Sequence, residues 1–361
     1  MVDMKSWFNE AFFQVLADQL HQQHKGFDRK SFLAEACDDL GTLALKARMH
    51  RAAVLTGQYL PESFIEALDI LYPLAREYDG TFQGMFFPEF VGIYGKGDIE
   101  SSLDALKYFT HYSSSEFAVR EFLMIDLERT LETMTDWAKD DNHHVRRLAS
   151  EGSRPRLPWS FQIRPLTQDP TPVKTILDTL KADPELYVRK SVANHLNDIS
   201  KDHPDTMLDW VGCWDGEVAE TGWIIKHASR SLLKQGHPRA FALFGFEADP
   251  DVDVPDLTLS QKSIALGDKL SFSFSVTSRK IRPQKLCIDY IVHYVKKSGK
   301  TAPKVFKLTE AVMPSGDVRK ISKSQTFENF STRTHYAGEH KIEIMINGLS
   351  VASASFELKI I

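Results

Sequence analysis

Two similar stretches, Asp140-Asp-Asn-His-His-Val-Arg-Arg147 and Ala182-Asp-Pro-Glu-Leu-Tyr-Val-Arg-Lys190, indicate how the larger part of this 361-residue chain folds. Each stretch has an acidic turn followed by a Val-Arg pair, and the two pairs are 43 residues apart. A period of about 40–47 residues is typical of paired helices that stack into a solenoid. In such a solenoid one helix of each pair packs against its neighbours, and the other lines a concave surface.

The helical pattern extends over residues 1–245. Apolar residues recur there at three- and four-residue spacing, and turn residues interrupt them every 12–20 positions. We therefore expect a HEAT-like α-solenoid. The helix expected after residue 183 has an apolar stripe, which predicts a core: Val188, Val192, Leu196 and Ile199. A second stripe, Lys190, Asn194 and Asp198, is either a solvated face or the lining of a groove.

The period changes to two beyond residues 246–256, an acidic segment with two prolines that we interpret as a linker. Apolar and polar residues alternate in four later segments: 269–276, 286–294, 341–346 and, in part, 351–356. Asn347-Gly348 and two other Gly-containing segments supply turns. About seven short strands in residues 257–361 favour an immunoglobulin-like β-sandwich. The fold class is thus multidomain α plus β.

Charge is unevenly distributed along the chain. The net charge is -5, but residues 251–361 carry 17 Lys and Arg against 11 Asp and Glu, a balance of +6. The other residues carry 27 against 38, a balance of -11. Any polyanion bound by the larger part must therefore meet a local basic patch, since the overall field there is repulsive.

Three further features restrict the class of protein. The three cysteines, Cys37, Cys213 and Cys287, are widely spaced, which fits a reducing cytosol without disulfides. We expect neither a secretory leader nor a membrane span, because the required apolar runs are missing. The His pairs His21/His24 and His143/His144 have no third ligand nearby in the sequence, so we expect no metal and no other cofactor.

The segment 142–160 concentrates unusual chemistry. An acid, two guanidinium groups and an indole lie within nine positions, and two prolines stiffen the backbone between them: Glu151, Arg154, Pro155, Arg156, Pro158 and Trp159. Such groups on a short rigid segment suit a nucleobase and its phosphates. The alternative is a helix end followed by a Pro-rich turn with a packed Trp, since Trp is largely buried on average.

Three carboxylates at separate places in the helical region are candidate site residues. Glu116 and Arg120 have the four-residue spacing of a helical ion pair, as do Arg147 and Glu151. Both pairs are open to interpretation as simple surface ion pairs. If neighbouring repeats place Glu116, Glu151 and Asp198 on one wall, however, that wall favours a cationic ligand or transition state.

Longer stretches of the chain resemble a known family. The segments 142–160, 115–122, 188–200 and 85–91 are similar to the AlkC branch of the HEAT-like alkylpurine DNA glycosylases. The segments 293–307 and 331–340 resemble the immunoglobulin-like extension that some members of this branch carry. The resemblance covers nearly the whole chain.

This resemblance implies a monofunctional DNA glycosylase that removes cationic alkylated bases from double-stranded DNA, with 3-methyladenine as the typical substrate and 3-methylcytosine as a second candidate. Members of this family can act without burying a flipped base in a deep pocket. The residues that match the family's site are Asp198, Glu116, Glu151 and Trp159, with Glu121 as a rival for the position of Glu116. In this hypothesis carboxylates stabilise an oxocarbenium-like sugar, and Asp198 positions the attacking water.

The DNA-binding residues expected are polar or basic side chains of both regions: Arg147, Arg154, Arg156, Arg189, Lys190, Asn194, Arg230, Lys296, Lys297 and Lys300. Contacts with phosphate would position the duplex and make binding depend strongly on salt. The alternative role of these residues is solubility. We also expect a monomer in the bacterial cytosol or nucleoid.

Two other classes of protein remain open from the sequence. A non-catalytic HEAT-repeat scaffold that binds protein or nucleic acid is the main alternative, because such solenoids often bind ligands on the concave face. A lyase or nuclease that cuts the DNA backbone is the second. The sequence shows neither an obvious Schiff-base lysine nor a metal-binding set for it.

Overall fold

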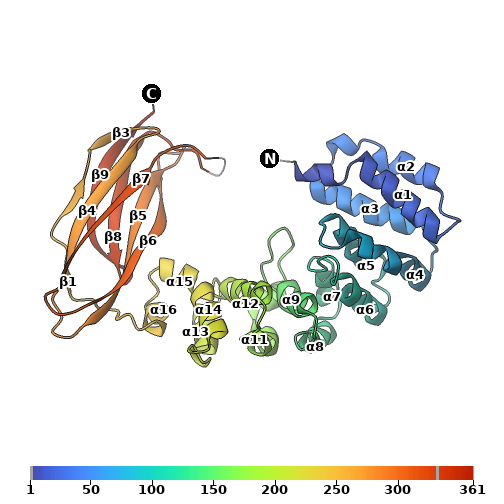
Figure 1. The fold of residues 1–361 in the computed structure, drawn as a ribbon, viewed down its shortest axis with the longest axis horizontal. Coiled ribbons are helices and arrows are strands. Elements are labelled where there is room, and N and C mark those ends of the chain that lie inside the picture. Colours follow the sequence, from blue (N-terminus) through green and yellow to red (C-terminus); the bar gives the residue numbers. More distant parts are fainter. Residues whose placement is uncertain (1–2, 331–332, 361) are drawn as a thin grey trace. The chain divides into compact units, whose positions relative to one another are not determined.

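The computed structural model describes residues 3–330 and 333–360, so Ser331 and Thr332, the first residues of the segment 331–340, lie outside the described part. The chain divides into two compact units (Figure 1). The first comprises Met1–Met207 and Cys213–Ala228, and the second comprises Leu208–Gly212 and Ser229–Ile361. The helical region and the β domain predicted from the sequence are both present. The compact division places residues 229–245 with the β domain, whereas the sequence pattern puts the boundary at residue 245.

Helices account for nearly all regular structure up to residue 243, joined in places by short 3-10 turns. The α-helices of the described residues are α1 (Glu10–Gln23), α2 (Arg29–Cys37), α3 (Leu45–Tyr59), α4 (Phe64–Leu74), α5 (Phe86–Tyr94), α6 (Ile99–Phe109), α7 (Val119–Ile125), α8 (Leu127–Trp137), α9 (His143–Gly152), α10 (Arg164–Gln168), α11 (Lys174–Leu180), α12 (Leu186–Ile199), α13 (Pro204–Gly212), α14 (Ala219–Ala228), α15 (Arg230–Lys234) and α16 (Pro238–Leu243).

The repeated Val-Arg pair has a structural basis in the turn before each helix. Arg146 donates from Nη1 to the carbonyl oxygens of residues 140 and 141, at 3.0 and 2.9 Å. Arg189 repeats this contact with the carbonyl oxygens of residues 183 and 184, at 2.8 and 2.7 Å. In both cases the acceptors lie six and five residues before the arginine, so each side chain closes the turn that starts its own helix. The paired valines, Val145 and Val188, are fully buried.

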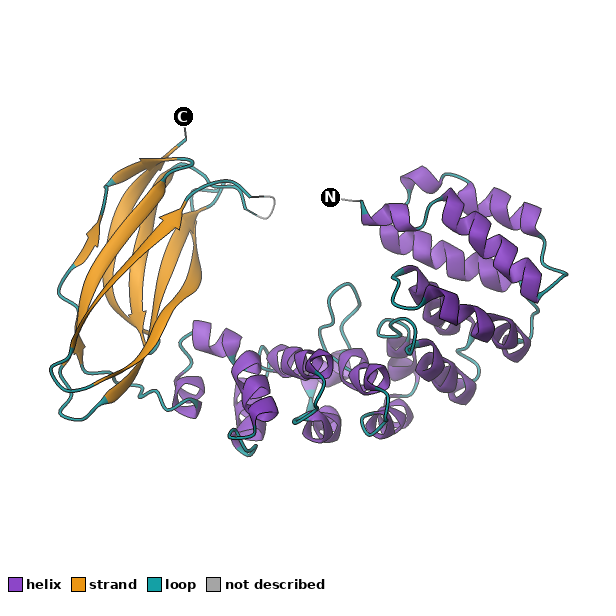
Figure 2. Cartoon of the chain, viewed as in Figure 1, coloured by secondary structure: helices purple, strands orange, loops and turns teal. Residues whose placement is uncertain are grey.

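An ion pair between the first turn of α9 and the turn before α12 joins the two successive repeats. Arg146 also binds the carboxylate of Asp183, with Nε 2.6 Å from Oδ2, and both side chains are nearly buried. Helices α9 and α12 pack side by side in one row, and α8 and α11 form the other row (Figure 1). The loop after α9 rises from the α9–α12 row on the side away from α8 and α11 (Figure 2). This arrangement brings the ends of α9 and α12 together.

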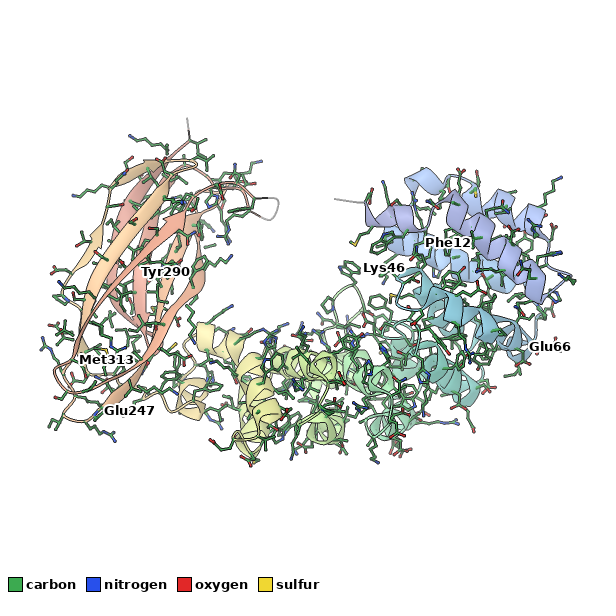
Figure 3. The ribbon with its side chains drawn as sticks, viewed as in Figure 1. Phe12, Lys46, Glu66, Glu247, Tyr290 and Met313 are labelled. Atoms are coloured by element: carbon green, nitrogen blue, oxygen red, sulfur yellow. The ribbon has the colours of Figure 1, made fainter. Side chains whose placement is uncertain are left out.

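The β domain consists of two sheets in the described residues. Its strands are β1 (Val252–Asp253), β2 (Leu257–Leu259), β3 (Ser263–Ala265), β4 (Lys269–Ser278), β5 (Gln284–Val295), β6 (Thr301–Met313), β7 (Val318–Thr326), β8 (Gly338–Ile346) and β9 (Leu349–Lys359). In one sheet β4 pairs with β1, β2 and β7, and the other has the order β3-β9-β8-β5-β6. The inward-facing residues form one apolar core that includes Tyr290, labelled in Figure 3.

The four alternating segments predicted from the sequence lie in β4, β5, β8 and β9, where apolar side chains alternate inward. The Asn347-Gly348 turn joins β8 to β9, and both residues have positive φ as a two-residue type I′ hairpin requires. The sequence pattern does not predict strands β6 and β7. Most of their side chains face solvent, so apolar and polar residues do not alternate along them. β6 is the edge strand of its sheet, a position that tolerates Pro303.

The segment 246–256, predicted to be a linker, is largely packed onto the β domain. Val252 and Asp253 form β1 and pair with β4. Glu247, labelled in Figure 3, forms ion pairs with Lys280 and Arg282. A small apolar cluster of Phe241, Phe246 and Cys287 fastens α16 to β5. No helix of the described residues is sufficiently long and apolar to cross a bilayer.

The close approach of Gly236 and Gly348 holds α15 and α16 against the β8–β9 turn. A Cβ on Gly348 would lie 2.8 Å from Cα of Gly236 and 3.0 Å from Cε2 of Phe241. We therefore expect Gly348→Ala to lower the free energy of unfolding by at least about 2 kcal/mol, through steric overlap in addition to the strain of a positive φ. Denaturant unfolding measures this loss. The matched control is Gly299→Ala, at φ 77° with no described atom within 4 Å of a new Cβ. Equal losses in the two variants would contradict the packing argument.

Candidate functional site

Three carboxylates from separate helical segments lie in one ionic network. Glu116 precedes α7, in a turn, while Glu151 and Asp198 are the penultimate residues of α9 and α12. Because α9 and α12 are packed side by side, their equivalent C-terminal turns bring Glu151 and Asp198 to the same place. The structure thus brings together the three acids whose convergence the sequence alone left open.

Two arginines join these carboxylates directly. Arg147 Nη1 lies 2.6 Å from Glu116 Oε2, and its Nη2 lies 3.5 Å from Glu151 Oε1. Arg154 Nη1 lies 2.7 Å from the same Glu151 oxygen, while its Nε and Nη2 both lie 2.8 Å from Asp198 Oδ2. Each arginine therefore bridges two acids, and charge-assisted bonds of this kind fix both position and orientation.

The network is nearly buried, and its charges hold one another in place. The side chains of Glu151 and Asp198 are 8% and 3% exposed. Burial by itself raises the pKa of Glu151, but the positive charges of Arg147 and Arg154 outweigh it, so the pKa lies below its ordinary value. Glu151 is therefore ionised at neutral pH. Removing one partner from such a network leaves a buried charge uncompensated, which is strongly destabilising.

Arg120 does not form the helical ion pair with Glu116 that the four-residue spacing allowed, because Glu116 lies in the turn before α7. The Arg120 guanidinium is fully buried and donates to the carbonyl oxygens of Gly152 (3.0 Å), Arg154 (2.6 Å) and Phe161. Burial lowers the pKa of Arg120 to about 10, so it remains charged at neutral pH. Arg120 thereby ties down the loop that carries Arg154.

One further cation contacts the network from its exposed side. Lys201 Nζ lies 2.8 Å from Asp198 Oδ1, and the lysine side chain is 46% exposed. Beside it, Arg156 makes a two-pronged ion pair with Asp202, in which both contacts measure 2.8 Å. Asp198 is thus bound on one oxygen by buried Arg154 and on the other by half-exposed Lys201.

Trp159 lies in the loop after α9 and is 58% exposed, in contrast to the packed Trp that the sequence left as an alternative. Its backbone has φ 65°, and its carbonyl oxygen accepts a 2.7 Å hydrogen bond from Lys46, labelled in Figure 3. It lines a pocket of about 280 Å³ together with Phe117 and Glu121. The rival acid Glu121 therefore shares a pocket with Trp159, and none of the three network carboxylates lines it.

The basic residues expected to contact DNA separate into two groups in the structure. Arg147 and Arg154 bind the network carboxylates, Arg156 binds Asp202, and Arg189 closes a turn. These guanidinium groups are therefore engaged by the protein, and their contact with DNA phosphates stays a prediction. The others are placed as follows: Lys190 exposed and Asn194 half-buried on α12, Arg230 half-buried at the start of α15, and Lys296, Lys297 and Lys300 exposed in the turn between β5 and β6.

Three residues next to the network were not selected from the sequence. Tyr187 places its ring 4.7 Å from the guanidinium of Arg147, an attractive cation–π contact. Lys201 follows Asp198 by three residues at the end of α12, a spacing that is common on helices and carries little signal. His195 precedes Asp198 by three residues and is fully buried. Its place on the apolar side of α12 is indistinguishable in sequence from an ordinary core position.

His195 supports the backbone beneath Glu151. Its Nδ1 lies 3.0 Å from the carbonyl oxygen of Ser150, so Nδ1 carries the proton and donates it. Ser191 adds a second link between the helices, with its hydroxyl 3.0 Å from that of Ser150. Burial and, to a smaller extent, the positive charge of Arg154 lower the pKa of His195 to about 3. His195 is thus neutral throughout the physiological range.

Chemically, this arrangement holds ionised carboxylates at fixed positions in a low-dielectric environment. Such preorganised charge stabilises a developing cation without reorganisation at the moment of reaction. An ionised carboxylate is also a hydrogen-bond acceptor for an attacking water. The network therefore has the components for a reaction that passes through a positively charged carbon.

Two parts of the chain match known protein families, and nearly the whole chain is similar to two known proteins. The family described as "DNA alkylation repair enzyme" matches residues 104–232, and the family described as "Uncharacterised protein YhaZ, C-terminal Ig-like domain" matches residues 253–360. The uncharacterised protein YhaZ of Bacillus subtilis is 43% identical over 359 residues, which cover 99% of this chain and 100% of that protein. A solved structure of the Pseudomonas fluorescens alkylpurine DNA glycosylase AlkC, bound to DNA containing an abasic-site analogue, is similar with a TM-score of 0.93. Its identity is 44%, with 99% of each chain covered.

The low pKa of His195 predicts an acid-dependent loss of stability. Its pKa is about 3 in the folded protein and 6.5 in the unfolded chain, so the unfolded state binds more protons between these values. Stability should therefore fall as the pH drops below 6.5, by up to about 1.4 kcal/mol per pH unit from this group. In His195→Asn the side-chain amide replaces the Nδ1 donor but does not titrate, so the number of protons taken up on unfolding in acid should fall by about one. Calorimetric unfolding between pH 4 and 7 measures it. The same pH slope in variant and wild type would contradict the assignment.

Proposed function

The chain belongs to the AlkC branch of the DNA alkylation repair enzymes, and on this basis we propose that it hydrolyses the N-glycosidic bond of cationic alkylated bases in double-stranded DNA. The substrate we favour is 3-methyladenine, with 3-methylcytosine second. The observation that carries the proposal is the network in which Arg147 and Arg154 gather Glu116, Glu151 and Asp198 from three helical segments.

The charge of the substrate explains why carboxylates suffice. A base methylated at N3 carries a formal positive charge and leaves as a neutral molecule, so it needs no general acid. When the bond between the base nitrogen and C1′ breaks, its electron pair goes to the base, and the sugar is left as an oxocarbenium-like cation. The carboxylates of Glu151 and Asp198, held in place by the arginines, favour that cation. A neutral base lacks the same leaving ability, and this difference provides selectivity.

We assign the attacking water to Asp198. The water oxygen forms the new bond to C1′, and one of its protons passes to the carboxylate and then to solvent. Glu116 and Glu151 complete the set of carboxylates, and Arg154 holds Asp198 through two nitrogens on one oxygen, which leaves Oδ1 on the exposed side of the network. Trp159 is exposed on a loop tied down by Arg120 and Lys46, where its indole is available to pack against the sugar or base edge.

Contacts with DNA would come from exposed cations of both units. The AlkC of Pseudomonas fluorescens has been solved bound to DNA, and the similarity extends over 99% of both chains. Lys190 on α12 and the three lysines of the β5–β6 turn are exposed, as phosphate ligands must be. We propose that the protein acts as a monomer on chromosomal DNA in the bacterial cytosol.

Replacing the proposed water-binding acid should stop the reaction. We expect Asp198→Asn to lower the single-turnover excision of 3-methyladenine by at least about 100-fold, the scale of losing one preorganised catalytic group, while affinity for duplex DNA stays within a few-fold. The assay is release of free methylated base from alkylated DNA, without added metal or nucleotide. The control is Asp136→Asn, an exposed acid at the end of α8 paired with Lys139. Unchanged excision by Asp198→Asn would remove its role, and strand cleavage without added base or heat would favour a lyase.

The β5–β6 turn should contribute to DNA affinity without choosing the base. Replacing Lys296, Lys297 and Lys300 by Ala removes three exposed positive charges, so the slope of log K against log salt should fall in magnitude by about two to three. The ratio of excision rates for different cationic bases should not change. Fluorescence anisotropy with a labelled duplex at several salt concentrations gives the slope. Lys320→Ala with Lys323→Ala, two exposed lysines of β7, is the control. An unaltered slope in the triple variant would show that the turn does not meet phosphate.

A further inference from the structure

The carboxylate network is fully neutralised in the free protein. Glu116, Glu151 and Asp198 are bonded directly by three cations, Arg147, Arg154 and Lys201. Arg120, whose guanidinium binds only backbone oxygens among its described hydrogen-bond partners, adds a fourth positive charge beside them. The sequence predicted a wall of negative charge, but the site of the free protein has no excess negative charge. A cationic transition state gains full stabilisation only if one of these cations withdraws.

Lys201 is the cation best placed to withdraw. The side chains of Arg147 and Arg154 are 15% and 7% exposed and each bridges two carboxylates, whereas Lys201 is 46% exposed and contacts one. Water reaches the Lys201 ammonium group and screens its pair with buried Asp198, and the long lysine side chain loses freedom in forming it, so this contact is weaker than the buried arginine bridges. The backbone of Lys201 is held at the end of α12 by a 3.2 Å hydrogen bond to the carbonyl oxygen of Asp198, so withdrawal requires only a side-chain rotation.

The position of Lys201 on Asp198 matters for the chemistry. Lys201 bonds Oδ1, while Arg154 holds Oδ2 through Nε and Nη2. An oxygen already bonded to an ammonium group is a poorer acceptor for a water proton. When Lys201 leaves, Oδ1 becomes available while Arg154 keeps the carboxylate in the same orientation. The buried arginine thus fixes the geometry, and the exposed lysine controls access to the reactive oxygen.

We propose that Lys201 is a phosphate-responsive counter-ion. In the free protein its ammonium group covers Asp198 Oδ1, and on binding DNA it moves to a backbone phosphate, which uncovers that oxygen next to the scissile sugar. The same movement shifts the charge of the network by one negative unit as the substrate arrives. This inference rests on the proposed glycosylase function. The competing role is structural, because a lysine near the C-terminus of a helix is favoured by the helix dipole alone.

The test compares Lys201→Gln with a matched pair elsewhere in the helical unit. Lys139 and Asp136 have the same three-residue spacing at the end of α8, with a contact of 3.0 Å, so Lys139→Gln removes an exposed ion pair of the same spacing that includes no network residue. Two quantities are measured. One is the salt dependence of affinity for a duplex that contains a neutral abasic-site analogue. The other is the single-turnover rate of 3-methyladenine excision at saturating enzyme.

For Lys201→Gln we expect the slope of log K against log salt to fall in magnitude by about one, the loss of one phosphate contact. The saturated excision rate should stay within about threefold of wild type, because Asp198 is uncovered in the bound state of both proteins. Lys201→Arg should keep the wild-type slope, and Lys139→Gln should match wild type in both measurements. An unchanged slope in Lys201→Gln would overturn the proposal, as would a tenfold or greater fall in the saturated rate, which would mean that Lys201 stays on Asp198 during the reaction.

The two proposals fail in different ways. If wild-type protein released no methylated base, the glycosylase function would fail, while the salt slope on the abasic-analogue duplex would still decide whether Lys201 contacts phosphate. If wild type released base normally and Lys201→Gln kept the wild-type slope, only the counter-ion role would be lost.

Discussion

The bridging of two carboxylates by one arginine is the interaction on which the site depends. Arg154 joins Glu151 of one repeat to Asp198 of the next, and Arg147 joins Glu116 to Glu151. Three negative charges would not stay together in a nearly buried space without these guanidinium groups. The arginines in turn require a rigid backbone, which Arg120 provides by donating to three carbonyl oxygens around the loop after α9. The acids, the arginines and the loop therefore form one cooperative unit.

The solenoid repeat supplies the geometry that this network needs. Arg146 and Arg189 close equivalent turns, so α9 and α12 begin in the same way, and both carry an acid in the penultimate position. Packing equivalent helices side by side converts a period in the sequence into two adjacent carboxylates. His195 and the Ser150–Ser191 contact lock the two helices at the level of these acids. Fold and site thus arise from the same repeated unit.

Much of the fold could be predicted from periodicity in the sequence, whereas the site could be predicted only in part. The Val-Arg repeat and the alternation in β4, β5, β8 and β9 are local patterns, so both domains were predictable. β6 and β7 lack the pattern because their side chains face solvent, and the packing of residues 246–256 depends on contacts with β4 and β5. At the site, the acids were identified as candidates, but the contacts of Arg147 with Glu116 and of Arg154 with Asp198 depend on long-range packing that no local spacing encodes. No sequence pattern identified Lys201, because its role depends on its contact with Asp198 in the folded protein.

The most direct test of the account is a structure of the protein bound to a duplex that contains a positively charged pyrrolidine in place of the damaged nucleotide's sugar. The account predicts that the ring nitrogen lies within ion-pairing distance of Asp198 or Glu151, while Arg154 still bonds Asp198 and the Lys201 ammonium faces a phosphate. A sugar bound away from these carboxylates, with the network unchanged and closed, would contradict it.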